Sequence, residues 1–122
     1  MNNCYVYVYL VPRKKGTFRY GNLVFGFEPF YIGKGSGKRF LFRLYACGRF
    51  WVLSKVKAIR VVGLEPIIKK LFEDMSHDEA CDREIAVIRT IGRADLGAGP
   101  LVNLTDGGEG MRNVSKALHE KL

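Results

Sequence analysis

The fold is decided near the start of the chain by the stretch YVYVYL at residues 5–10. Aromatic and β-branched residues in unbroken succession are typical of a strand. The two-residue period places the three tyrosines on one face and the aliphatic side chains on the other. A second strand is predicted from Phe27 to Ile32, and a basic loop over residues 13–22 lets the two strands pair antiparallel. In that pair Tyr31 can share a face with Tyr7.

The middle of the chain alternates between turn and helix signals. Residues 33–37 (GKGSG) predict a sharp flexible turn, and a short helix is expected over residues 38–46. A basic helix is predicted from about residue 50 to residue 62, because its apolar residues recur at helical spacing. Residues 66–72 favour a third strand, and the proline at its start suits an edge position.

A helix start signal follows at Ser76, with Glu79 three residues later as the second member of a capping box. The helix is predicted to run to Ile91, with Gly92 as its C-terminal cap. The glycine-rich stretch after it is turn-like, and residues 114–122 predict a last short helix. The whole is expected to be one α/β (α+β) domain over residues 1–122, with a small, largely antiparallel three-stranded sheet flanked by helices.

Charge is distributed unevenly along the 122 residues. The chain has a net charge of +8 and is 48% hydrophobic, which is enough for a proper core. Residues 1–70 hold fourteen basic and two acidic residues, a charge of +12, whereas residues 71–122 carry −4. A basic half of this size indicates a polyanionic partner, with nucleic acid as the first choice.

Several classes of protein do not fit the composition. No apolar run approaches the length of a membrane span, and the start does not resemble a secretory signal. The three cysteines, Cys4, Cys47 and Cys81, are too widely spaced for a disulfide framework or a paired zinc site. We therefore expect a protein of a reducing compartment, cytoplasmic or associated with a nucleoid or nucleus, that is neither secreted nor bound to a membrane.

The glycine segment at residues 33–39 (GKGSGKR) invites comparison with a phosphate loop. A nucleotide-binding phosphate loop needs four residues between its glycines and Ser or Thr after the lysine; here three residues intervene and Arg follows. Unhindered amides, a following helix N-terminus and basic side chains still favour an anion site. A basic, solvated turn is the alternative interpretation of the same residues. The candidates for phosphate binding are Gly33, Lys34, Gly35 and Lys38.

Glu84 stands out on the helix that begins at Ser76. Positions 81, 84, 88 and 91 share one face, and the other three are apolar. A carboxylate in an apolar stripe is costly unless it is paired or bound to a metal. A place at the margin of the stripe with an arginine partner and a metal site are both compatible with this pattern.

The residues YVY at 5–7 and YIG at 31–33 resemble the two signature strands of the GIY-YIG nucleases. Arg39 matches the arginine that follows the second motif in that family, and Arg43 is the alternative one helical turn later. Glu84 matches the metal-binding glutamate of a later helix, and Asn103 matches a downstream asparagine. The resemblance covers essentially the whole chain, although the spacer between the two strands is longer than the usual tight hairpin.

This resemblance implies a mechanism. Glu84 would hold a single Mg²⁺, with Mn²⁺ as the alternative ion, and mostly water would complete its coordination. Tyr7 would act as general base or position the attacking water, and Tyr31 would hydrogen-bond the phosphate or that water. Arg39 would neutralise charge on the phosphoryl oxygens, and Asn103 completes the expected site.

The resulting hypothesis is a metal-dependent DNA endonuclease that acts on duplex or branched DNA. A non-catalytic nucleic-acid-binding module on the same scaffold is the alternative, because neutralising phosphate requires no chemistry. A nucleotide-binding enzyme is a third, weaker reading. A homodimer or an accessory protein would supply specificity, since no separate DNA-reading domain is evident. Further phosphate contacts are predicted at Arg43, Lys55, Lys57 and Arg60.

Overall fold

Strand β1 (Cys4–Tyr20) is the middle strand of an antiparallel sheet with the order β2-β1-β3. Its neighbours are β2 (Leu23–Ser36) and β3 (Ile67–Met75). The computed structural model describes residues 2–41 and 50–107. Two helices, α2 (Phe50–Val61) and α3 (His77–Ile91), complete the architecture, which confirms the expected α+β class with a three-stranded antiparallel sheet.

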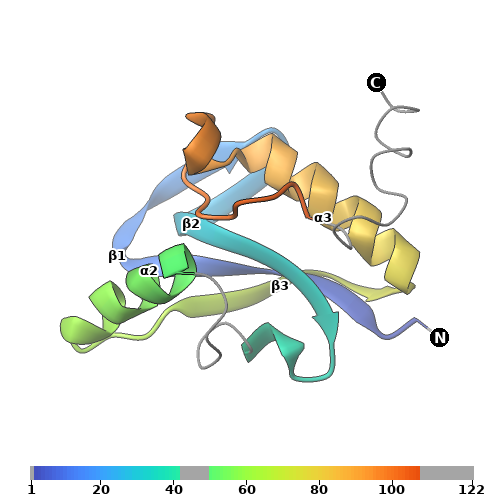
Figure 1. The fold of residues 1–122 in the computed structure, drawn as a ribbon, viewed down its shortest axis with the longest axis horizontal. Helices are drawn as coiled ribbons and strands as arrows, with labels where there is room; N and C mark the ends of the chain where they lie inside the picture. The colour runs from blue at the N-terminus through green and yellow to red at the C-terminus, as the bar shows by residue number, and fades with distance from the viewer. Residues whose placement is uncertain (1, 42–49, 108–122) are drawn as a thin grey trace.

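The two helices cover opposite faces of the sheet, with α3 at the upper right and α2 at the lower left in Figure 1. The alternation of residues 5–10 explains this division, because each face offers one set of side chains. Below the sheet, the tyrosine face consists of Tyr5, Tyr7, Tyr9 and Tyr31, which pack with Val52, Val56 and Ile59 of α2. Above the sheet, the valine face consists of Val6, Val8, Leu10 and Ile32, which pack with Val87, Ile88 and Ile91 of α3.

The loop predicted over residues 13–22 is wrong, because β1 continues to Tyr20 and turns into β2 at Gly21 and Asn22. Gly21 has a φ of 58°, which a residue with a side chain rarely adopts. Three shifts of register between β1 and β2 interrupt the two-residue period. Because the alternation of side chains is lost at each shift, the sequence pattern does not indicate a strand there. The hairpin bends so that Phe18 and Phe25 join the core beneath α3.

The sharp turn predicted at residues 33–37 is also misplaced. β2 continues through Ser36, and the turn falls at Gly37 and Lys38. A single turn of 3-10 helix, η1 (Arg39–Leu41), follows where the longer helix over residues 38–46 was expected. The rest of that expected helix and the last helix over residues 114–122 lie outside the described residues.

The capping box at the start of α3 is confirmed. The Ser76 hydroxyl accepts a hydrogen bond of 3.2 Å from the Glu79 amide, and the Ser76 amide donates one of 2.8 Å to the Glu79 carboxylate. At the other end, the Gly92 amide donates to the carbonyl of Ile88 at 2.8 Å. β3 is an edge strand, as Pro66 indicated. Within the described part of the chain, no helix has the length and apolarity that crossing a bilayer requires.

Candidate functional site

Tyr7 and Tyr31 lie on the same face of the sheet, as the alternation predicted. The β1/β2 register pairs Tyr7 with Gly33 and Tyr9 with Tyr31, and directly opposed residues share a face. The ring centroids of Tyr7 and Tyr31 are 6.3 Å apart, and the two residues are only 3% and 8% exposed. The two signature tyrosines are therefore neighbours in a buried aromatic cluster.

Gly33 makes room for the phenol of Tyr7. A Cβ built on Gly33 would overlap the Cζ and hydroxyl oxygen of Tyr7, so any side chain at this position would push the phenol aside. In a strand, glycine commonly marks a close approach of this kind. The glycine of the YIG motif is thus explained by the tyrosine of the YVY motif, and not by a turn.

Tyr5 and Tyr9 hold the segment that carries Arg39, a role that the sequence analysis missed. The Tyr5 hydroxyl donates to the carbonyl of Gly37 at 2.7 Å and accepts from the amide of Phe40 at 3.0 Å. The Tyr9 hydroxyl donates to the carbonyl of Phe40 at 2.6 Å. Burial raises the pKa of the Tyr5 phenol above its usual value of 10.0, against the opposing effect of its hydrogen bonds. Tyrosine in place of phenylalanine on a buried strand is the signal for such partners.

Arg39 lies on the tyrosine face. A Cβ built on Gly35 would overlap Cβ and Cγ of Arg39, so the arginine stem crosses this glycine. Gly35 is paired with Tyr5 in the ladder, and the Arg39 charge is close enough to lower the pKa of Tyr5 against the larger effect of burial. The structure thus brings Tyr7, Tyr31 and Arg39 to one face, while the alternative arginine, Arg43, lies outside the described residues.

The backbone of the glycine segment is occupied by the sheet. Both main-chain groups of Ile32 point outward to Asn103, so the alternation of an antiparallel ladder turns those of Gly33 and Gly35 inward to β1. Residues 39–41 form a 3-10 turn, and the rest of the expected helix lies outside the described residues. The amide argument for phosphate binding at Gly33 and Gly35 is therefore lost, while binding by the side chains of Lys34 and Lys38 stays a prediction.

Asn103 fastens the C-terminal segment to the free edge of β2. Its side-chain oxygen accepts from the amide of Ile32 at 3.1 Å, and its side-chain nitrogen donates to the carbonyl of Ile32 at 2.9 Å. The amide of Val102 donates to the carbonyl of Phe30 at 2.8 Å. These bonds fix the backbone on both sides of Tyr31. The contacts that the structure shows for Asn103 are therefore structural, and its catalytic role stays a prediction.

Glu84 comes from α3, which covers the valine face, so its helix and the tyrosine pair are on opposite sides of the sheet. Glu84 is only 7% exposed. A Cβ built on Gly107 would lie 2.9 Å from the Glu84 carboxylate, so this glycine passes close to it. Gly107 is four positions after Asn103 in the chain, a span of at most about 14 Å. Glu84 is thereby tied to the same β2 edge that flanks Tyr31.

An arginine network holds this C-terminal segment against α3. Arg93 donates to Asp95 at 2.6 Å and to Asp106 at 2.9 Å, and Arg89 lies 3.6 Å from Asp106. The hydrogen bonds that Arg93 donates to Asp95 and Asp106 raise its pKa, and the bond to Asp95 lowers the pKa of the Asp95 carboxyl. Because Asp106 lies one residue before Gly107, the network also fixes the backbone beside Glu84.

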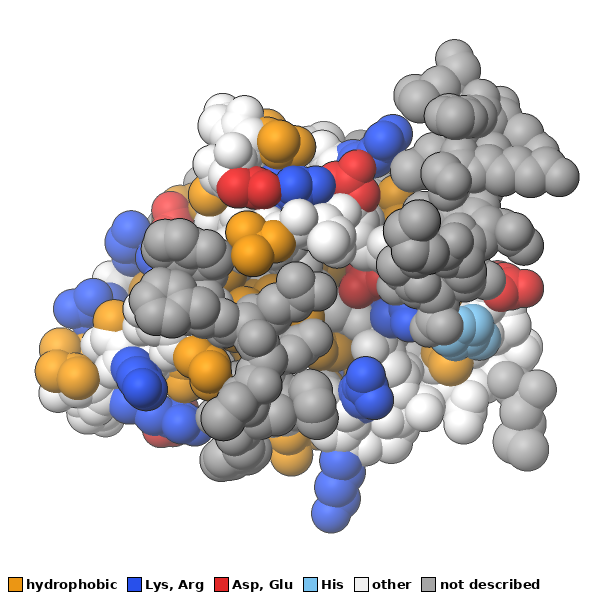
Figure 2. Space-filling model, in the orientation of Figure 1, with side chains coloured by type: hydrophobic (Ala, Val, Ile, Leu, Met, Phe, Trp, Pro, Cys, Tyr) orange, Lys and Arg blue, Asp and Glu red, His pale blue; other side chains and the backbone are white. Residues whose placement is uncertain are grey.

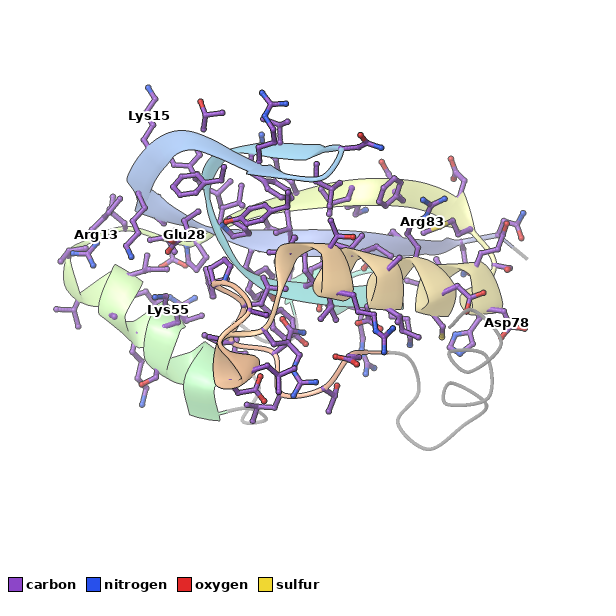
Figure 3. The ribbon with its side chains drawn as sticks, turned by 90° about the horizontal axis from the view of Figure 1, so that it is seen from above. Arg13, Lys15, Glu28, Lys55, Asp78 and Arg83 are labelled. Carbon is purple, nitrogen blue, oxygen red and sulfur yellow. The ribbon has the colours of Figure 1, made fainter. Side chains whose placement is uncertain are left out.

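Basic side chains gather around α2 and below the strands, while many of the acidic side chains seen from this side lie higher (Figure 2). Arg13 of β1 and Lys55 of α2 lie at the same end of the molecule (Figure 3). Lys57 is exposed on the same helix. Arg60, also a predicted phosphate contact, makes a two-pronged ion pair with Glu65 at 2.9–3.1 Å. The expected basic surface is therefore present, with one of its members already paired.

No protein-family model, curated protein or solved structure matches this chain. Within the described residues, no group of three or more His, Cys, Asp and Glu side chains is arranged to hold a metal ion. A cation site here would therefore depend on few protein ligands, and Glu84 is the candidate among the predicted residues.

Proposed function

We propose that this chain is a metal-dependent DNA endonuclease of the GIY-YIG type, which hydrolyses phosphodiester bonds in duplex or branched DNA. The observation that carries this proposal is the interlocking of the two motifs. The phenol of Tyr7 lies over Gly33. The ring centroid of Tyr31 is 6.3 Å from that of Tyr7, on the same face. A sequence that merely happened to contain the tripeptide YIG would not need its glycine to accommodate the tyrosine of another motif.

The roles follow from what each group can do at its place. Tyr7 accepts a proton from the attacking water as a phenolate, or orients that water as a neutral phenol, and Tyr31 hydrogen-bonds a phosphoryl oxygen. Arg39, held over Gly35 on the same face, places a fixed positive charge where negative charge grows during phosphoryl transfer. Tyr5, Tyr9 and Asn103 keep these groups in place through hydrogen bonds to the backbone.

The chemistry of Glu84 suits a hard divalent cation such as Mg²⁺. A carboxylate oxygen is the ligand type that Mg²⁺ prefers, and this ion commonly keeps several waters and needs only one or two carboxylates. When bound, the ion would supply Lewis-acid polarisation of a phosphoryl oxygen.

The experiment that tests the proposal is cleavage of matched linear, nicked, branched and single-stranded DNA with Mg²⁺ or Mn²⁺. We expect metal-dependent cleavage of at least one double-stranded form. Glu73→Gln removes an exposed carboxylate from β3 and serves as the control for Glu84→Gln. Cleavage by Glu73→Gln and none by Glu84→Gln supports the proposal, whereas no cleavage of any substrate by the unmodified protein contradicts it.

A second candidate function is a non-catalytic nucleic-acid-binding module. It is favoured by the burial of Tyr7 and Tyr31, since rings 3% and 8% exposed are also what core packing produces. The basic surface around α2 serves it equally well. The same assay separates the two functions, because a binding module retains DNA without nicking it whichever metal is present.

A further inference from the structure

Lys70 of β3 lies directly opposite Tyr7 in the β1/β3 ladder. Opposed residues of an antiparallel pair share a face, so Lys70 belongs to the tyrosine face. A shift of register between Val6 and Tyr7 produces this arrangement, because Val6 is paired with Phe72 and regular continuation would place Leu71 opposite Tyr7. Bulges often redirect a side chain in this way beside a functional site.

Two aromatic rings fix the position of the Lys70 ammonium group. Its Nζ atom lies 4.5 Å from the ring centroid of Tyr5 and 4.9 Å from that of Phe40. Both distances are within the range of cation–π attraction. The Tyr5 ring is 6.0 Å from the Tyr7 ring, and Phe40 follows Arg39 in η1. The ammonium group therefore lies between Tyr5, whose ring is next to that of Tyr7, and Phe40, which follows Arg39 in the chain.

No carboxylate among the described residues neutralises the charge of Lys70. Within residues 2–41 and 50–107, no carboxylate forms an ion pair with it. The two acidic residues of the basic half have other partners, since Glu28 pairs with Lys14 at 3.2 Å and Glu65 pairs with Arg60 at 2.9 Å. Lys70 is also exposed, so its charge is available to an anionic ligand.

We propose that Lys70 is a second phosphate-binding cation of the tyrosine face. It contacts a backbone phosphate of the bound nucleic acid that neighbours the phosphate bound by Arg39. The inference rests on the proposed function for the identity of the ligand. A compact ammonium group held in place by rings suits a phosphate oxygen as a point charge. The bulge in β3 is then functional, because it places Lys70 opposite Tyr7 where a regular strand would place Leu71.

The adjacent Lys69 offers a matched control. Lys69 is equally charged and exposed, but it is paired with Val8 and so belongs to the opposite face. Methionine keeps the length of the lysine stem and removes only the charge. Duplex DNA labelled with a fluorophore is titrated with the unmodified chain, Lys70→Met, Lys69→Met and Lys70→Arg at several salt concentrations. A chelator is present throughout, so that binding is measured without cleavage.

We expect Lys70→Met to lower the slope of log K against log salt by about 0.9, the value for one lost phosphate contact on duplex DNA. Its affinity should fall roughly tenfold, as for a lost charge-assisted hydrogen bond. Lys70→Arg should keep the original slope, and Lys69→Met should change it far less. Equal slopes for Lys70→Met and Lys69→Met would overturn the proposal, as would an unchanged slope in Lys70→Met.

Thermal unfolding distinguishes a purely structural role of Lys70 from a role in binding phosphate. If Lys70 only packs against Tyr5 and Phe40, Lys70→Met lowers the melting temperature and leaves the salt slope unchanged, which also overturns the proposal. Should Lys70→Met not fold, the comparison of Lys70→Gln with Lys70→Arg replaces it. A protein that binds DNA through Lys70 but never nicks it would contradict the endonuclease function and leave the phosphate contact standing.

Discussion

The phenol of Tyr7 occupies the space that a side chain on Gly33 would fill. These two residues are opposed in the β1/β2 ladder, so the overlap follows from the register of the sheet. A small change at Gly33 must therefore move the Tyr7 hydroxyl, although the substitution adds only one methyl group. The site can be tested through this pair without touching a candidate catalytic residue.

Gly33→Ala is expected to abolish most cleavage while the protein still folds. The added methyl forces the Tyr7 ring to shift, and overpacking of this kind costs about 1–3 kcal/mol of stability. A displacement of about 1 Å in a catalytic group can cost on the order of 100-fold in rate. Gly26→Ala on the same strand is the control, because a Cβ there meets nothing within 4 Å. Plasmid nicking and thermal unfolding measure the two effects; wild-type nicking by Gly33→Ala would contradict the role of Tyr7.

Asn103→Ala is expected to destabilise the fold by about 1–3 kcal/mol, since it leaves the buried amide and carbonyl of Ile32 without their partner. Urea unfolding measures this loss, with exposed Asn3→Ala as the control. Cleavage should fall with the loss of order around Tyr31. An unchanged unfolding free energy would show that Asn103 does not hold the β2 edge.

Tyr5→Phe is expected to reduce stability less at pH 11 than at pH 8. The pKa of Tyr5 is raised in the folded protein by burial, so its contribution is complete below the ordinary value of 10.0. That contribution is lost as the pH rises above 10.0, because the unfolded chain ionises first. Urea unfolding at the two pH values measures the gap between the variant and the unmodified protein. An equal difference in unfolding free energy between Tyr5→Phe and the unmodified protein at the two pH values would contradict the raised pKa of Tyr5.

Ser76→Ala is expected to cost about 1 kcal/mol at pH 7, because it removes an N-terminal cap from α3. The pKa of Glu79 is lowered, first of all by its hydrogen bond from the Ser76 amide. The part of the stability linked to Glu79 is therefore present above the ordinary carboxyl value of 4.5 and lost as the pH falls below it. Urea unfolding from pH 7 to pH 3 checks the trend, with exposed Ser54→Ala on α2 as control. If the unmodified protein lost stability as the pH rose from 3 to 7, the lowered pKa of Glu79 would be contradicted.

Local patterns predicted those parts of the fold that local interactions determine. The alternation at residues 5–10 correctly divided the two faces, and the capping box correctly placed the start of α3 at Ser76. The hairpin beyond Val11 was missed because its register shifts break the two-residue period. The glycines at 33 and 35 were read as a turn, although they provide room for Tyr7 and Arg39.

Long-range partners could not be read from the sequence. Asn103 bonds to a residue 71 positions earlier, and nothing near it in the sequence indicates this partner. Lys70 faces Tyr7 only because of a shift in the β1/β3 register, which a regular strand pattern does not contain. Glu84 was correctly singled out as a carboxylate in an apolar stripe, since helical periodicity alone determines that face.

The proposed function requires that Glu84, on the α3 side of the sheet, supports metal-dependent cleavage of DNA together with Tyr7 on the opposite face. The most direct measurement is the rate of supercoiled plasmid nicking against Mg²⁺ concentration for the unmodified protein, Glu84→Gln and Glu73→Gln. We expect the unmodified protein and Glu73→Gln to nick with the same saturable dependence on Mg²⁺, and Glu84→Gln to be inactive while it still binds the plasmid. Nicking by Glu84→Gln at the unmodified rate, or nicking that persists in a chelator, would contradict the account.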